Sequence, residues 1–271
     1  MTDILTVLAV TAVTGLATGL GALPVFFRAS VSHRTYDASL GLAAGIMIAA
    51  SVFALIIPGM DEGGLGTVIA GVFVGGLGLL AANRLVPHVH AWYQSREGHG
   101  GADLDAFASE TPHVTDSADR ERDSRLRRAV LVGTAITLHN APEGLAMGVA
   151  FASGLENVAF VLAVVIGLQN VPDGFAFAVP ASDTGMGNGR VLLWTTLSGA
   201  VPQVVMAVFG FYLVTIATGL FPIAAGFAAG AMMAVVFREM IPSSHGHGHA
   251  DAATGAFLVG FVLLVVVDTV L

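Results

Sequence analysis

The chain alternates long runs of apolar residues with short polar segments. A helix needs roughly 20 mostly apolar residues to cross the hydrocarbon core of a bilayer, and eight such runs occur here. They predict an all-α, polytopic membrane protein that forms a single domain, 1–271. The predicted spans cover about 3–27, 37–58, 64–86, 129–153, 156–180, 189–218, 221–242 and 252–271.

The composition agrees with this pattern. Only 11% of the residues are charged and 55% are hydrophobic, whereas soluble domains carry about 25% charged residues. The absence of cysteine excludes disulfides and thiolate metal sites, and the absence of lysine excludes Schiff-base chemistry. We therefore expect a multi-pass protein of the cell membrane that is embedded in lipid, is not an enzyme and has no nucleic-acid partner.

The basic residues predict the orientation. All 11 are arginine, and all of them fall on one side of the predicted spans. Arg34 follows the first span, Arg190 lies between the fifth and sixth, and Arg238 lies near the end of the seventh. Because positive loops face the cytoplasm, we expect that side to be cytoplasmic and both termini to be extracytoplasmic.

The segment 88–127 is the one long loop that the pattern predicts. It is rich in Asp, Glu, Ser and Gly and poor in large apolar residues, which favours a flexible cytoplasmic loop. It also contains His88, His90, His99 and His113. Loose metal binding and an ordinary solvated linker are both consistent with this composition.

A polar cassette interrupts the fourth predicted span and returns in the fifth. The stretch "LHNAPEG" at 138–144 is matched 30 positions later by "LQNVPDG" at 168–174. His139 and Glu143 are four residues apart and share one helix face. Pro142 and Pro172 lack an N–H, so we expect the fourth and fifth helices to be kinked there.

If the two helices pack together, the cassettes bring two carboxylates, an imidazole and amide oxygens to one place. Two carboxylates in a low dielectric repel each other, and a divalent cation between them would neutralise both. Imidazole with carboxylate suits zinc, iron and manganese, and Met47 could add a thioether from the second span. The alternative is that these polar groups only hydrogen-bond to each other and kink the helices.

The paired cassettes resemble those of the ZIP family of divalent-metal transporters, in its bacterial and archaeal branch. "GLAAGIMIAASVF" in the second span and "FREMIPSSHGHGH" at the end of the seventh are also similar to family stretches. The resemblance implies import of Zn²⁺, or of Fe²⁺, Mn²⁺ or Cd²⁺, into the cytoplasm. The metal would then be the substrate, and no cofactor is expected. A midplane site would have the ligands His139, Glu143, Gln169, Asp173 and Met47.

The resemblance also implies a mechanism. The first, fourth, fifth and sixth spans would move together as an elevator, against a scaffold of the other four spans in a homodimer. The pair Gly41 and Gly45 fits either sliding contact or ordinary tight packing. Asn140 and Asn170 match two positions of a second, adjacent metal site that many relatives have.

Three departures from the family pattern weaken that second site. Asn170 stands where relatives can carry Asp, Val201 precedes Pro202 where the family often has Glu, and Asp173 replaces the usual Glu. Gln203 is the nearest polar substitute in the sixth span. We expect one tightly bound metal and a second that is weak or absent.

Further polar residues lie near the ends of the predicted pathway. Glu239 matches an exit position, although Arg238 replaces the histidine of relatives and could equally be a membrane anchor. The cytoplasmic exit would also include His245, His247 and His249, although a solvated loop explains these histidines as well. The entrance on the outer side would include Asp61 and Glu62.

Other functions remain open at this point. A membrane metal sensor would bind metal without transport, and an exporter would reverse the direction. An intramembrane metalloprotease would need a His-Glu-x-x-His motif, which the chain lacks.

Overall fold

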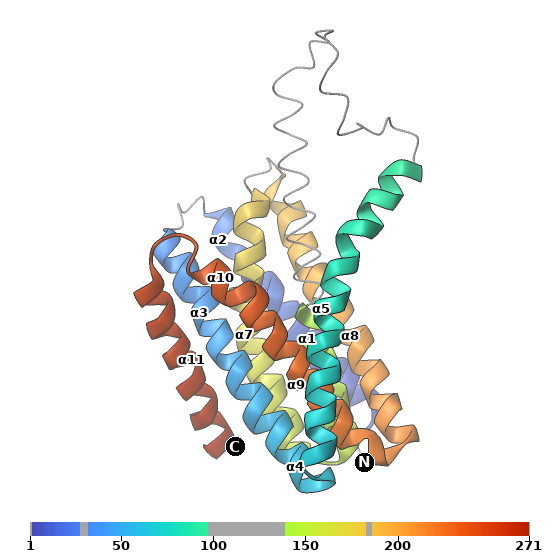
Figure 1. Ribbon diagram of the computed structural model, residues 1–271. Helices are drawn as coiled ribbons and strands as arrows, with labels where there is room; N and C mark the ends of the chain where they lie inside the picture. Colours follow the sequence, from blue (N-terminus) through green and yellow to red (C-terminus); the bar gives the residue numbers. More distant parts are fainter. Residues whose placement is uncertain (1, 28–31, 97–138, 183–185, 271) are drawn as a thin grey trace, which may run out of the picture.

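The described part of the protein is built from helices (Figure 1). The computed structural model describes residues 2–27, 32–96, 139–182 and 186–270, and no strand occurs within these ranges. Seven of the described helical stretches are long and apolar enough to cross a membrane. The expected all-helical, multi-pass architecture is therefore confirmed.

The elements follow one another in up-and-down order. In the first half they are α1 (Ile4–Leu20), α2 (Leu23–Phe26), α3 (His33–Ala49), the π-helix η1 (Ala50–Ile56), α4 (Ile57–Gly63) and α5 (Leu65–Arg96). After a helical segment at 139–153 come α7 (Glu156–Ser182), α8 (Asn188–Ile216), the 3₁₀ turn η3 (Thr218–Leu220), α9 (Phe221–Val235), the π-helix η4 (Val236–Met240), α10 (Ile241–Ser244) and α11 (Ala250–Val270).

Seven of the eight predicted spans match these candidate membrane helices within a few residues. The fourth, 129–153, is described only at 139–153, so the count of eight stays a prediction. Helix α5 continues to Arg96, so the predicted loop 88–127 is helical at its start, and the remainder lies outside the described residues. Hydropathy marks where a helix leaves the membrane, whereas its internally paired backbone can continue into water.

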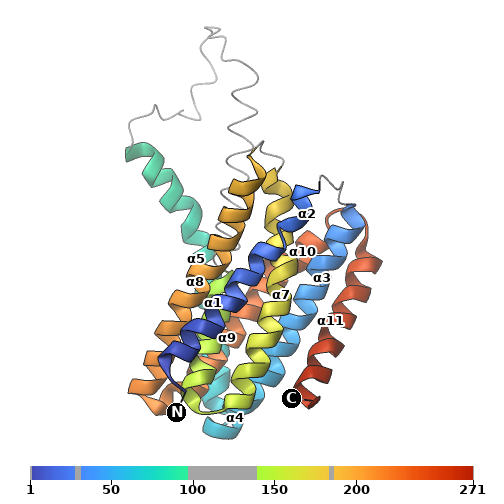
Figure 2. The ribbon, with the colours of Figure 1, turned by 180° about the vertical axis from the view of Figure 1, so that it is seen from behind.

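The helices divide into two groups. The first bundle contains α1, the segment 139–153, α7 and α8, and the second contains α3 to α5 and α9 to α11. The second bundle faces the viewer in Figure 1 and the first in Figure 2. Among the described helices of the two bundles, α7 of the first packs against α3 of the second. This division matches the helices that the resemblance assigned to a moving unit and a scaffold.

Glycines bring the helices of each bundle into close contact. A Cβ on Gly41 or Gly45 would meet carbonyl oxygens of α11, and one on Gly71 or Gly75 would meet those of α9. Each described glycine with a close neighbour on another helix finds it inside its own bundle. Gly41 and Gly45 thus serve tight packing within the second bundle and do not lie at the boundary between bundles.

Two wide turns interrupt the second bundle. The π-helices η1 and η4 end two residues before Pro58 and Pro242, which have no N–H and crowd the carbonyl four residues earlier. A π turn accommodates that crowding and is often found at functional sites. Helix α7 by contrast continues through Pro172. The kinks expected at Pro142 and Pro172 remain predictions.

Candidate metal-binding core

The two cassettes meet inside the protein. His139 and Asp173 are only 8% and 5% exposed, and Asn140, Glu143, Gln169 and Asn170 are fully buried. A single amide connects the carboxylates: Nε2 of Gln169 donates to Oε1 of Glu143 at 2.5 Å and to Oδ2 of Asp173 at 3.3 Å. An N–H₂ group with partial positive charge therefore lies between the two acids.

The glycine of each cassette explains how these helices come so close to their neighbours. A Cβ on Gly144 would meet the backbone oxygen of Gln203 in α8, and one on Gly174 would meet that of Thr18 in α1. Each carboxylate precedes such a contact, at Glu143 and Asp173. The sequence Pro-acid-Gly therefore places an acid directly beside a point where two backbones touch.

Burial makes these acids electrostatically costly. Among the residues that the structure describes, the buried set contains no arginine, and His139 is its one basic side chain. Oε2 of Glu143 and Oε1 of Gln169 are buried and have no hydrogen-bond partner in this described set. Buried polar atoms are normally satisfied, so either a cation or a hydrogen-bond donor could occupy the place beside these two oxygens.

The asparagine of the second cassette points elsewhere. Nδ2 of Asn170 donates to the carbonyl of Thr14 at 2.6 Å and to Oε1 of Gln203 at 3.0 Å. The donor end of Asn170 is therefore committed to α1 and α8. Gln203, singled out in the sequence as the nearest polar substitute in the sixth span, is fully buried and is the direct partner of Asn170.

Met47 is also fully buried, on the helix α3 that packs against α7. No three His, Cys, Asp or Glu side chains within the described ranges are already gathered as a metal site. The core consequently needs its amides, the thioether or a local rearrangement to complete a coordination shell. The proposed ligands His139, Glu143, Gln169, Asp173, Met47, Asn140 and Asn170 remain predictions.

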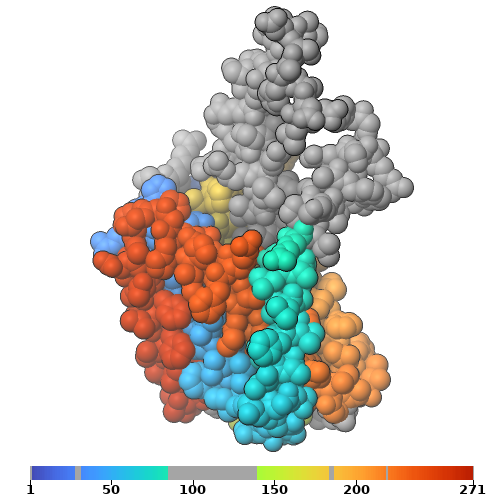
Figure 3. Space-filling model, viewed as in Figure 1, coloured from blue at the N-terminus to red at the C-terminus, as the bar shows by residue number. Residues whose placement is uncertain are grey.

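A cavity of about 330 Å³ connects this core with one end of the protein. His139 and Asp173 are part of its lining, and the rest comes from α3, α7, η4 and α10: Tyr36, Leu40, Ala176, Arg238, Glu239, Met240, Pro242 and Ser243. Figure 3 shows the η4–α10 segment between α11 and α5. The chain termini lie at the opposite end (Figure 1).

Glu239 is closer to the core than its sequence position suggested. Its Oε2 lies 3.4 Å from Nδ1 of His139, and its Oε1 accepts a hydrogen bond of 2.7 Å from Asn83 of α5. Glu239 belongs to the π-helix η4. Asn83 and Tyr36 were not predicted from the sequence, because no periodic or motif signal connects α5 or the start of α3 with η4.

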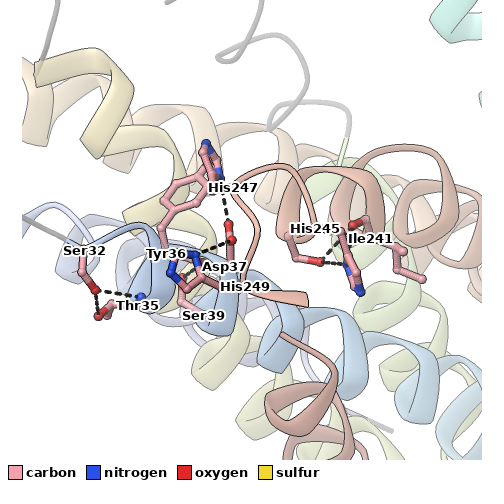
Figure 4. Close-up of polar contacts among 10 residues, drawn as sticks. Ser32, Thr35, Tyr36, Asp37, Ser39, Ile241, His245, His247 and His249 are labelled. Atoms are coloured by element: carbon pink, nitrogen blue, oxygen red, sulfur yellow. Dashed lines mark hydrogen bonds and ion pairs between the residues drawn. The ribbon is translucent and has the colours of Figure 1, made fainter. Parts of the chain in front are cut away.

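The remaining predicted residues separate into two places. Asp61 and Glu62 are exposed on α4, at the end opposite to the cavity. His245 contacts the carbonyl of Ile241 and the hydroxyl of Ser244 within its own turn. His247 and His249 instead approach α3 (Figure 4). The histidines of the loop 88–127 lie outside the residues whose side chains are described.

Comparison with known proteins gives a consistent set of relatives. The chain is 36% identical over 263 residues to the zinc transporter GufA of Myxococcus xanthus, covering 94% of both chains. It is 38% identical to the zinc transporter ZIPB of Bordetella bronchiseptica, covering 94% of this chain and 78% of that protein. Human zinc transporter ZIP11 is 30% identical, with 93% of both chains covered. No family model matches the chain.

Proposed function

Because the chain belongs to the prokaryotic branch of the ZIP family of zinc transporters, we propose that it imports divalent metal into the cytoplasm through the paired cassettes. It is a multi-pass membrane protein and a transporter, not an enzyme, and the metal is its substrate and not a cofactor. Zinc is the proposed main substrate, with Fe²⁺, Mn²⁺ and Cd²⁺ as further candidates.

One observation carries the proposal: two buried carboxylates, bridged by an amide N–H₂, with no buried arginine in the described set. In the proposed site a metal takes the place of that N–H₂ group. Rotation of the Gln169 amide by half a turn presents Oε1, which is now unpaired among the described residues. Imidazole and carboxylate, supplied by His139, Glu143 and Asp173, suit zinc.

We propose that the core binds one metal tightly. Glu143 and Asp173 balance the charge of one divalent ion, and Asn170 and Gln203 are neutral and hydrogen-bonded to each other. A second ion beside the first would find no further buried carboxylate next to Glu143 and Asp173 among the described residues. Elemental analysis of purified protein should find one zinc that depends on Glu143 and Asp173. Two zinc ions lost together on replacing these acids would contradict this proposal.

The proposed exit path follows the cavity from His139 to Glu239. A metal leaving the core can keep His139 and exchange Asp173 for Glu239, because the His139 and Glu239 side chains already face each other at 3.4 Å. Arg238 also lines this cavity, and its fixed positive charge would discourage the ion from staying. The cavity would then be the inward-facing branch of an alternating-access cycle, and Asp61 with Glu62 would lie at the entrance.

The packing supports movement of the first bundle as a unit. Backbone-to-backbone contacts at glycines join helices inside each bundle, so each bundle can move without breaking them. The cassettes lie in the first bundle and Met47 in the second. A shift of the first bundle along the membrane normal would therefore change the distance from Met47 to the metal. Family membership also leads us to propose a homodimer, held through the second bundle, which light scattering in detergent would test.

The proposed direction of the cavity can be tested with a single cysteine, since the chain has none. Ala176 lines the cavity and is 8% exposed, so Ala176→Cys should react with a membrane-impermeant maleimide applied from the cytoplasmic side. Added zinc should slow the reaction, because an ion in the core blocks access. The measurement is the labelling rate in right-side-out and inside-out vesicles.

Ala225→Cys is the matched control, because Ala225 is fully buried in α9 and lines no part of this cavity. It should stay unlabelled from both sides. Labelling of Ala176→Cys from the outer side alone would show that the proposed orientation is reversed.

A further inference from the structure

A buried carboxylate lies outside the core, at the start of α3. Asp37 is fully buried, and two histidines from the turn between α10 and α11 approach its two oxygens (Figure 4). Nδ1 of His247 lies 2.8 Å from Oδ1, which is a hydrogen bond. Nδ1 of His249 lies 3.6 Å from Oδ2, which is too long for one.

Both atoms of the longer contact are unsatisfied. Oδ2 of Asp37 and Nδ1 of His249 are buried and have no hydrogen-bond partner among the described residues. Two ligand atoms on one tetrahedral zinc, each at about 2.0–2.1 Å from the metal, are about 3.4 Å apart. The separation of 3.6 Å is therefore close to that of two ligands of one ion.

The surroundings hold this pair in place. The hydrogen bond from His247 orients the carboxylate, as second-shell partners do for metal-binding carboxylates. The ring of His247 in turn stacks on His33, with centroids 4.6 Å apart, and meets Tyr36 edge-on at 5.5 Å. Because Tyr36 also lines the cavity, this cluster lies beside the proposed exit path.

We propose that Asp37 and His249 form a second, peripheral binding site for a divalent transition metal, separate from the core. Two protein ligands hold the ion and water completes its shell, so binding is weak and exchange is fast. This open arrangement agrees with the absence, in the described ranges, of a ready-made site with three such ligands. The role of the site as a release point for imported metal rests on the proposed function; its ability to bind metal does not.

The test uses the full chain with Glu143→Gln and Asp173→Asn, so that the core no longer contributes. Zinc is titrated while carbethoxylation of each histidine is followed by mass spectrometry. We expect zinc to protect His249 and leave His245 reactive, since the hydrogen bonds of His245 to described residues stay within its own turn. In the same background Asp37→Asn should weaken this protection at least about tenfold in zinc concentration, whereas His245→Gln should not change it.

Asp37→Asn keeps an oxygen for His247 and removes the buried charge, and His249→Gln is a second variant in case the first does not fold. Equal protection of His245 and His249, or protection of His249 that survives Asp37→Asn, would overturn the proposal.

Zinc uptake by Asp37→Asn in an otherwise unchanged protein separates the proposed peripheral site from the proposed core site. We expect uptake to remain saturable, because the core is intact, and to become slower, because the release point is lost. Failure of the core proposal would instead appear as uptake that survives loss of Glu143 and Asp173.

Discussion

Replacing Glu143 by Gln and Asp173 by Asn together should abolish saturable zinc uptake into proteoliposomes. Loss of a single outer-shell partner typically lowers metal affinity 10–100-fold, so removal of both acidic ligands should lower uptake by at least about 100-fold. The amides have nearly the same shape as the acids and remove two buried charges, so the fold should tolerate them. Gln169 can still hydrogen-bond to both positions.

Glu156→Gln is the matched control, because Glu156 is exposed at the start of α7 and contacts only Thr2 among the described hydrogen-bonding side chains. Its uptake should equal that of the unmodified protein. Uptake that survives the double substitution would show that the cassettes are structural and that the site lies elsewhere. Tight zinc binding without uptake in the unmodified protein would favour a metal sensor over a transporter.

Gly174→Ala should destabilise the first bundle and reduce uptake. The added Cβ would meet the backbone oxygen of Thr18, and because no flexible side chain can turn away, α1 and α7 must separate. Overpacking of this kind costs about 1–3 kcal/mol. It also displaces Asp173, the neighbouring residue, relative to Glu143. We expect a lower melting temperature in detergent and a lower uptake rate in liposomes.

Gly255→Ala on α11 is the control for helix propensity, since a Cβ there has no neighbour within 4 Å in the described structure. Alanine favours a helix by up to about 1 kcal/mol relative to glycine, so this variant should be as stable as the unmodified protein or more so. A melting temperature for Gly174→Ala equal to that of Gly255→Ala would show that the α1–α7 contact is looser than described.

The cassettes could be recognised in the sequence because all of their residues lie close together in the chain. A proline, an acid and a glycine within an apolar helix are visible in seven residues, and a repeat 30 positions later makes coincidence improbable. The residues that meet near the cavity have no local motif that would identify them. Asn83 and Glu239 are hydrogen-bonded across 156 positions, and Asp37 with His247 across 210. Nothing in the pattern of α3 distinguishes Asp37 from a solvated acid near a helix start.

The three histidines at 245, 247 and 249 illustrate the same limit. Their alternating spacing suggested one group, yet His245 contacts its own turn while His247 and His249 reach Asp37. The π turn of η4 likewise has a visible cause in Pro242, but the direction in which it points Glu239 depends on where the segment 139–153 packs.

By itself the sequence determined the helical class, the position of most spans, the paired cassettes and the family resemblance. These follow from hydropathy and from residues within a turn or two of each other, which the backbone arranges by its own period. Only the tertiary structure decided the glycine contacts within each bundle, the cavity beside His139, and the meeting of Asp37 with His249. Such contacts join residues far apart in the chain, and their geometry is set by how closely glycine-bearing helices pack.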